Sequence, residues 1–100
     1  MTRKISLSVN DKAIDLDYFV AGYLDHVTGG IISSLKGTGE VNDLELDIDG
    51  DGTVTVILNG ADIPLNFFAN EIVRSTLAGM VAPLKGVTGA VETLELKIAR

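Results

Sequence analysis

Two stretches of this chain, 49 positions apart, carry the same apolar pattern. Apolar residues that recur every three or four positions are typical of a helix with one broad buried face, so helices are expected over 16–37 and 65–86. In the first stretch the pattern consists of Leu16, Phe19, Val20, Tyr23, Leu24, Val27, Thr28, Ile31, Ile32 and Leu35. In the second it consists of Leu65, Phe68, Ala69, Ile72, Val73, Thr76, Leu77, Met80, Val81 and Leu84.

Capping residues indicate where each helix begins and ends. Asp17 and Asn66 stand where an N-cap side chain accepts a hydrogen bond from the first helical turn. Gly37 and Gly86 stand where a left-handed residue commonly ends a helix. Pro83 lies inside the second stretch, and because proline has no N–H, it predicts a kink in the last turn of that helix.

Each helical stretch is preceded by two segments of alternating polarity and followed by a third, which predicts six strands. In the first half, an Asn-Asp pair at 10–11 forms a two-residue turn that places Leu7 opposite Ile14. In the second half, the turn is the Asn-Gly pair at 59–60, which is typical of a type I′ hairpin. The expected strands lie near 5–9, 13–16, 42–48, 54–58, 62–65 and 91–98.

The two halves also align residue by residue. Positions 5–37 and 54–86 share 8 identities in 33 pairs, and the third strands share 6 in 10. Most identities lie at expected caps, turns and core positions. We therefore interpret the chain as a single domain, 1–100, built from two repeats, 3–49 and 53–99, which share one core because half of such a chain would be marginally stable alone.

These patterns predict an α+β fold made by tandem duplication of a β-β-α-β unit. The expected architecture is a mostly antiparallel six-stranded sheet with two helices on one face and a pseudo-two-fold axis, because only one strand face is apolar. Within each unit the first strand is expected between the second and third, and Pro64 puts the second strand at a sheet edge. One six-stranded sheet and two facing layers both fit the pattern.

Composition narrows the classes of partner. The formal charge is −6, with no basic cluster, so neither nucleic acid nor an anionic membrane surface is an expected partner. Cysteine is absent, which excludes disulfides and thiolate chemistry. Residues 1–12 alternate in polarity instead of forming the apolar region of a signal peptide, so a cytoplasmic location is expected. The apolar fraction of 46% suggests an oligomer interface.

The acidic turn at 47–53 is the clearest candidate for binding chemistry. Asp47, Asp49 and Asp51 alternate and are followed by Gly52, as in the opening of a calcium loop, so these three carboxylates are the predicted metal ligands. Leu58 departs from that motif, because it occupies the position of the bidentate glutamate. The alternative interpretation is a solvated hairpin turn, since Asp and Gly are ordinary turn residues.

Other polar or exposed candidates have simpler explanations. His26 lies off the apolar pattern and is expected on the surface, with no partner that would make it a general base. The segment 34–39 ends a helix, so its dipole would repel phosphate. Tyr18 and Phe67 are either exposed anchors for a partner or staples under the hairpins. Small residues along the first helix favour either a close helix or subunit contact or plain exposure: Ala21, Gly22, Asp25, Gly29 and Ser33.

The second half resembles a family of short uncharacterised prokaryotic β-β-α-β proteins about one repeat long. The resemblance rests on N-G-x-x-I-P-L-N-x-F from Asn59, on G-M-V from Gly79 and on L-K-G from Leu84. It implies that single units pair as homodimers and that this chain is a fused version. No activity is implied by it.

Taken together, the sequence predicts a non-catalytic structural or protein-interaction domain that self-associates or binds a protein partner. The alternative is a calcium- or small-ligand-binding module that uses the acidic turn. No enzyme is expected, because one histidine and no cysteine leave few groups for a catalytic constellation.

Overall fold

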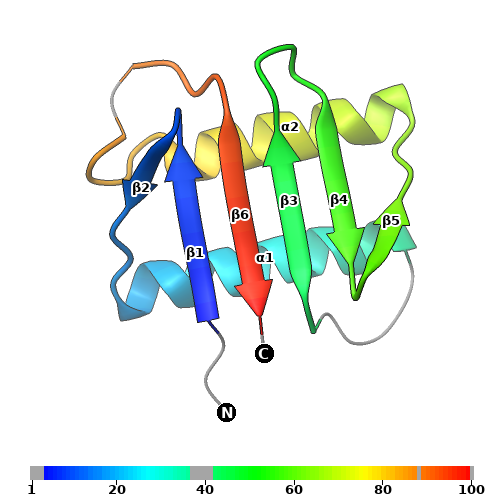
Figure 1. Ribbon diagram of the computed structural model, residues 1–100, viewed down its shortest axis with the longest axis horizontal. Helices are drawn as coiled ribbons and strands as arrows, with labels where there is room; N and C mark the ends of the chain where they lie inside the picture. The colour runs from blue at the N-terminus through cyan, green and yellow to red at the C-terminus, as the bar shows by residue number, and fades with distance from the viewer. Residues whose placement is uncertain (1–3, 37–41, 88, 100) are drawn as a thin grey trace.

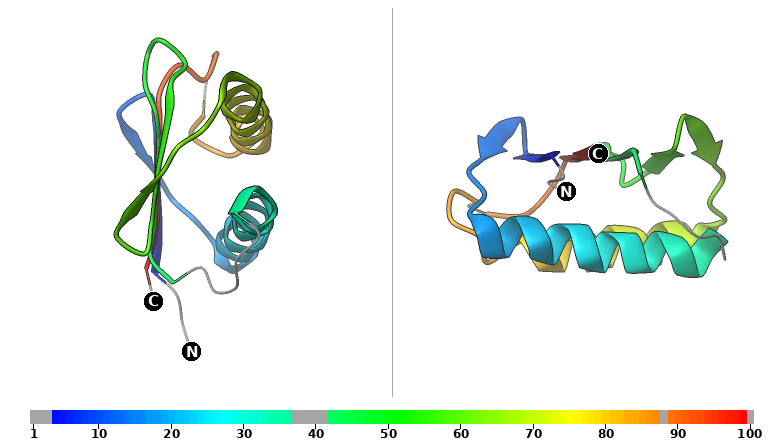
Figure 2. Two further views of the ribbon diagram at one scale, coloured as in Figure 1. Left: turned by 90° about the vertical axis from the view of Figure 1, so that its right-hand side faces the viewer. Right: turned by 90° about the horizontal axis from the view of Figure 1, so that it is seen from below.

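A computed structural model describes residues 4–36, 42–87 and 89–99 as an α+β protein with two helices and one antiparallel sheet. Six strands lie side by side in the order β2-β1-β6-β3-β4-β5 (Figure 1), which decides between one sheet and two layers. Both helices cover the same face (Figure 2). The elements are β1 (Lys4–Val9), β2 (Lys12–Ile14), α1 (Tyr18–Lys36), β3 (Leu44–Ile48), β4 (Val54–Leu58), β5 (Ala61–Ile63), α2 (Phe67–Val81) and β6 (Leu94–Ala99).

Both predicted hairpins are confirmed. Asn10 and Asp11 have φ angles of 51° and 65°, and Asn59 and Gly60 have 51° and 84°. Two consecutive positive φ angles are the signature of a type I′ turn, whose twist matches that of the flanking strands. The turn at 10–11 pairs Leu7 with Ile14, as expected.

The position of the third strands differs from the prediction. We expected β1 between β2 and β3, but its second neighbour is β6, from the other half of the chain. The reason is the helix direction: α1 begins beside β2 and ends beside β5, crossing the strands (Figure 1). Its 19 residues span roughly 28 Å, enough to cross six strands spaced by about 4.8 Å. The chain therefore crosses the sheet along α1, and β3 joins the half of the sheet that contains β4 and β5.

The core lies between the sheet and the helices. Along β3, β4 and β6 the side chains alternate between buried and more exposed, so one sheet face is apolar, as predicted. A central row joins Leu7, Leu96, Leu46 and Val56 on four adjacent strands. The helices cover this row with side chains that are entirely buried, among them Leu24, Ile32, Val73 and Leu77.

Side-chain caps begin both helices, as predicted. The N–H of Val20 donates to Asp17 Oδ1 at 2.8 Å, and the N–H of Ala69 donates to Asn66 Oδ1 at 2.7 Å. The second helix was expected to continue to Lys85 with a kink, which is wrong. It ends at Val81, because Pro83 supplies no N–H for a further helical bond. The predicted end of the first helix at Gly37 lies outside the described residues.

The third strands begin two or three residues later than predicted, at Leu44 and Leu94 instead of 42 and 91. Asparagine side chains at the hairpin turns explain the difference. The N–H groups of Asn42 and Asp43 donate to Asn59 Oδ1, each at 3.0 Å. Because these N–H groups bind a side chain instead of a neighbouring strand, β3 begins after them. The N–H groups of the residues before β6 donate in the same way to Asn10 Oδ1, at 2.8 and 2.9 Å.

Replacing Thr28 with valine is expected to raise the free energy of unfolding by about 1 kcal/mol. Thr28 is completely buried on α1, and its hydroxyl has no hydrogen-bond partner among the described residues. Valine keeps the shape and removes the buried polar group. Urea unfolding measures the gain, with the half-buried Thr76→Val on α2 as the matched control. A loss of stability in Thr28→Val would mean that the hydroxyl is satisfied in solution.

Candidate functional site

The acidic turn joins β3 to β4 and is held by one of its own carboxylates. Asp49 Oδ1 accepts hydrogen bonds from the N–H groups of Asp51 and Thr53, at 3.0 and 2.9 Å. The N–H of Asp49 donates to the carbonyl of Thr53, and the N–H of Gly52 donates to the carbonyl of Asp49. Gly52 has φ 83°, a conformation that L side chains rarely adopt. One oxygen of Asp49 is therefore already used to close the turn.

The three predicted metal ligands do not surround one point. Asp47 and Asp49 line a shallow hollow of about 260 Å³ beside Glu95 and Asp11, two carboxylates that the sequence spacing did not bring to attention. Asp51 lines a different hollow. Among the described residues, no group of three or more His, Asp or Glu side chains is arranged to hold a metal ion. Calcium binding at 47–53 remains a prediction.

Asp47 lies on the open face of the sheet, directly opposite Glu95 on β6. Although its side chain is exposed, partial desolvation raises the pKa of Asp47 above its ordinary value of 3.8. The negative charges of Glu95 and Glu45 raise this pKa further, and Lys97 opposes them. Lys97 lies opposite Glu45, and its Nζ is 3.9 Å from Oε1 of Glu45. The positive charge of Lys97 is therefore shared between Glu45 and Asp47. This row of the sheet carries an excess of negative charge.

Replacing Asp47 with asparagine is expected to stabilise the protein by a few tenths of a kcal/mol at neutral pH, because like charges directly opposite in a sheet repel. The raised pKa of Asp47 means that the folded chain binds this proton more tightly than the unfolded chain. Stability therefore falls as pH rises from about 3.8 through the raised pKa, and the variant lacks this fall.

Urea unfolding between about pH 3 and pH 7 measures the effect. The gain of Asp47→Asn should vanish at the acidic end and shrink in high salt. Asp62→Asn on β5 is the matched control, because Asp62 faces Ile57 instead of a carboxylate. An equal gain in both variants would indicate a general effect of net charge.

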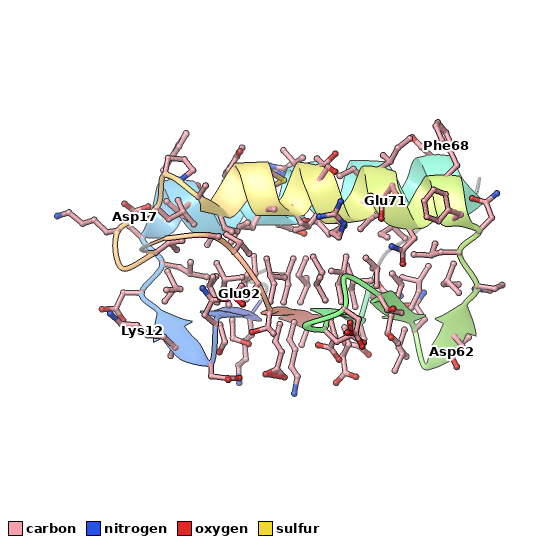
Figure 3. All side chains as sticks on the ribbon, turned by 90° about the horizontal axis from the view of Figure 1, so that it is seen from above. Lys12, Asp17, Asp62, Phe68, Glu71 and Glu92 are labelled. Atoms are coloured by element: carbon pink, nitrogen blue, oxygen red, sulfur yellow. The ribbon has the colours of Figure 1, made fainter. Side chains whose placement is uncertain are left out.

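The second hollow, of about 370 Å³, lies between the acidic turn and α2. It is lined by Asp51, Glu92, Glu71 and Arg74, of which Glu71 and Glu92 are labelled in Figure 3. Arg74 pairs with Glu71 at 2.6 Å, and this hydrogen bond lowers the pKa of the Glu71 carboxyl. Asn70 connects α2 to the turn by accepting from the N–H of Val54 and donating to the carbonyl of Gly52. The arginine in this hollow is thus neutralised, and the surrounding charge is acidic.

The remaining candidates fall on the helices. His26 is exposed on α1, as predicted. Ser34 is exposed near the end of α1, and residues 37–39 of the Gly-rich segment lie outside the described residues. Tyr18 and Phe67 are 96% and 82% exposed, so they do not act as staples under the hairpins.

Two aromatic residues were predicted to be buried, and this prediction is wrong. Phe19 is 74% exposed and Phe68 is 70% exposed. Figure 3 shows Phe68 on the side of α2 that faces away from the sheet. The apolar pattern on each helix is wider than the strip that the sheet and the other helix cover, and each phenylalanine stands at its outer border. An apolar pattern that is too wide to be covered completely is therefore the feature of the sequence that indicates exposed residues at its border.

Glycines inside the helices have no role that the fold explains. A Cβ added at Gly22, Gly29, Gly30 or Gly79 would meet nothing within 4 Å. Each glycine makes a helix less stable than alanine would by about 1 kcal/mol. Neither a tight contact within the chain nor a positive φ angle accounts for them. The small residues on α1 had two explanations, a close helix or subunit contact and plain exposure. At the glycines of α1, the described residues make no close contact within this chain.

No helix in the described part of the chain combines the length and apolarity needed to cross a membrane. Comparisons with protein-family models, with curated proteins and with solved structures find no match to this chain.

Proposed function

We propose that this chain is a non-catalytic interaction domain that associates with itself. One observation carries the proposal: four large aromatic side chains, Tyr18, Phe19, Phe67 and Phe68, are at least 70% exposed although the core is filled without them. A buried core of Leu, Ile and Val with Met80 accounts for the fold. Exposed apolar surface beyond that core is typical of protein–protein contacts.

The absence of catalysis is part of this proposal. In the described residues, the charged groups of the two hollows are carboxylates and one arginine that is paired with Glu71. General acid–base or nucleophilic chemistry needs a base within hydrogen-bond reach of a reacting group. His26 is exposed and lines neither hollow. A binding role therefore explains the surface with fewer assumptions than an enzyme.

We further propose that the chain is a fused duplication with a pseudo-two-fold axis through the sheet centre. The strand order supports this. When β1, β2 and β3 are exchanged with β4, β5 and β6, the same order is obtained, read from the opposite edge of the sheet. Leu46 pairs with Leu96, its equivalent 50 positions later. Asn10 binds the segment before β6 as Asn59 binds the segment before β3. The family resemblance agrees, since it implies single units that pair as homodimers.

Self-association is tested by measuring the mass of the whole chain in solution over a wide range of concentration. Sedimentation equilibrium, with native mass spectrometry on protein purified without chelator, should give a mass that rises from one chain to a defined oligomer. A mass of one chain at every concentration would contradict the proposal. Native mass spectrometry also detects any ligand that stays bound through purification.

A second candidate function is weak cation binding at the hollow lined by Asp47, Asp49, Glu95 and Asp11, whose described carboxylates do not already form a closed metal site. The observation that favours it is the placement of Asp47 directly opposite Glu95. Desolvation and the negative charge of Glu95 both raise the pKa of Asp47, and a bound cation would relieve the repulsion between these two carboxylates. Calcium at millimolar concentration should then raise the melting temperature.

The test of this second function compares two variants. Asp47→Asn should abolish the rise with calcium, whereas Asp51→Asn should preserve it, because Asp51 lines the other hollow. Both variants keep Asp49, whose carboxylate closes the turn. If calcium has no effect on the unsubstituted protein, cation binding is excluded.

A further inference from the structure

The helix layer has a surface that none of the described residues covers. We define the outer helix face by six residues on the two helices: Phe19, Tyr23, Gly30, Phe68, Ile72 and Gly79. Phe19, Phe68, Ile72 and both glycines are exposed, and the rings of Phe19 and Tyr23 stack with centroids 6.3 Å apart. Phe19 and Phe68 are identical residues 49 positions apart, and so are Gly30 and Gly79. Neither pair has a role in the core.

Charge distinguishes this surface from the other broad face. The open face of the sheet carries Glu45, Asp47, Asp62 and Glu95 in exposed positions, against the two cations Lys4 and Lys97, so its net charge is negative. Two copies of a chain with a charge of −6 would repel each other through that face. None of the six residues of the outer helix face is Asp, Glu, Lys or Arg, and beside this face Glu71 pairs with Arg74 at 2.6 Å. The six residues of the outer helix face therefore add no charge of their own to a contact between two copies, whereas the open sheet face adds net negative charge.

Gly30 and Gly79 give an independent reason for a close partner. Both are exposed and lie inside helices, Gly79 at the third-last position of α2. Glycine is less favourable than alanine in a helix, and an added Cβ at either would meet nothing within 4 Å. Residues without a side chain let the helix of another molecule approach closely. Among the residues that the structure describes, neither glycine has such a neighbour.

The helix side of the molecule is broad enough to hold a dimer interface around the outer helix face. The molecule measures 35 × 34 × 18 Å, so it is a flat slab whose helix side is one of its two broad surfaces. A rectangle with the two long dimensions is larger than the roughly 800 Å² that each partner contributes to a standard interface. A two-fold arrangement would place the same patch on both partners.

From these observations we infer that a second copy of this chain covers the outer helix face. The two helix layers meet across a two-fold axis, with Phe19 and Phe68 in the interface and both sheets facing outwards. This inference rests on the proposed self-association and specifies its surface.

The experiment is sedimentation equilibrium on the full chain and on three sets of variants. Phe19→Ser with Phe68→Ser should raise the dimer dissociation constant at least tenfold. Gly30→Ala with Gly79→Ala should also raise it at least tenfold, while the melting temperature of the monomer at low concentration should rise, because alanine favours the helix. The matched control is Ile57→Ser, a half-buried apolar residue on the open sheet face, which should leave the constant unchanged.

The outcomes separate this inference from the proposed function. A monomer at all concentrations would overturn both. A dimer that is weakened by Ile57→Ser and unaffected by the helix variants would overturn the inference and leave self-association standing. Circular dichroism checks that each variant is folded, and the glycine variants keep the test decisive if the double serine variant unfolds. Loss of dimer only in the helix variants would support the inference.

Discussion

Replacing Asn59 with alanine is expected to lower the free energy of unfolding by about 2–3 kcal/mol. Asn59 Oδ1 accepts hydrogen bonds from the N–H groups of Asn42 and Asp43, each at 3.0 Å. Alanine removes this shared acceptor. It also places a residue at a φ angle of 51°, where asparagine is tolerated but alanine is strained. Urea unfolding followed by circular dichroism measures the loss.

Two further substitutions at the same position separate these causes. Asn59→Gly relieves the strain and still lacks the acceptor, so it should recover only part of the loss. Asn59→Asp keeps an acceptor oxygen and tolerates the positive φ angle, so it should be the mildest of the three. Full recovery in the glycine variant would mean that the two hydrogen bonds contribute nothing.

Asn10→Ala should cost at least as much as Asn59→Ala. Asn10 Oδ1 accepts from the N–H groups of Glu92 and Thr93, and its Nδ2 donates to the carbonyl of Ala90 at 2.9 Å. These bonds join residues that are 80 to 83 positions apart in the sequence. The hairpin turn of each half therefore positions the chain as it approaches the third strand of the other half.

Local features of the fold were predictable because they depend on neighbouring residues. The Asn-Asp and Asn-Gly turns, the caps at Asp17 and Asn66, and the alternation along the central strands all appear in the structure. The exchange of the third strands was not predictable, because periodicity gives the buried side of a helix and not its direction over the sheet. The length of α1 becomes informative only when it is compared with the width of six strands.

The candidate surfaces were predicted less well. The spacing of Asp47, Asp49 and Asp51 suggested one site. Residues two apart in a strand share a face, which is consistent with Asp47 and Asp49 lining the same hollow, but the turn directs Asp51 to the other hollow. The structure places Asp11 and Glu95 near Asp47 instead, through strand pairings that join distant segments. Phe19 and Phe68 were assigned to the core because apolar residues usually are buried. Only the packed structure shows how much of each helix the sheet covers.

The centre of the sheet provides the prediction with the largest expected effect. Leu46→Ala and Leu96→Ala should each lower the free energy of unfolding by about 3 kcal/mol, because both side chains are completely buried and alanine leaves a cavity. A loss of this size is a large part of the total stability of a small domain. Urea unfolding of the two variants measures it. Lys97→Ala, an exposed neighbour on β6, is the control and should change stability by less than about 0.5 kcal/mol.

Comparing these two variants also tests the proposed duplication. Leu46 and Leu96 are paired across the centre of the sheet and flanked by Val56 and Leu7, which occupy corresponding places on β4 and β1. If a pseudo-two-fold axis relates the halves, the two cavities have similar surroundings and the two losses should agree within about 0.5 kcal/mol. A difference above about 1 kcal/mol would mean that one half packs more rigidly than the other. Equal losses would support two repeats that contribute equally to a single core.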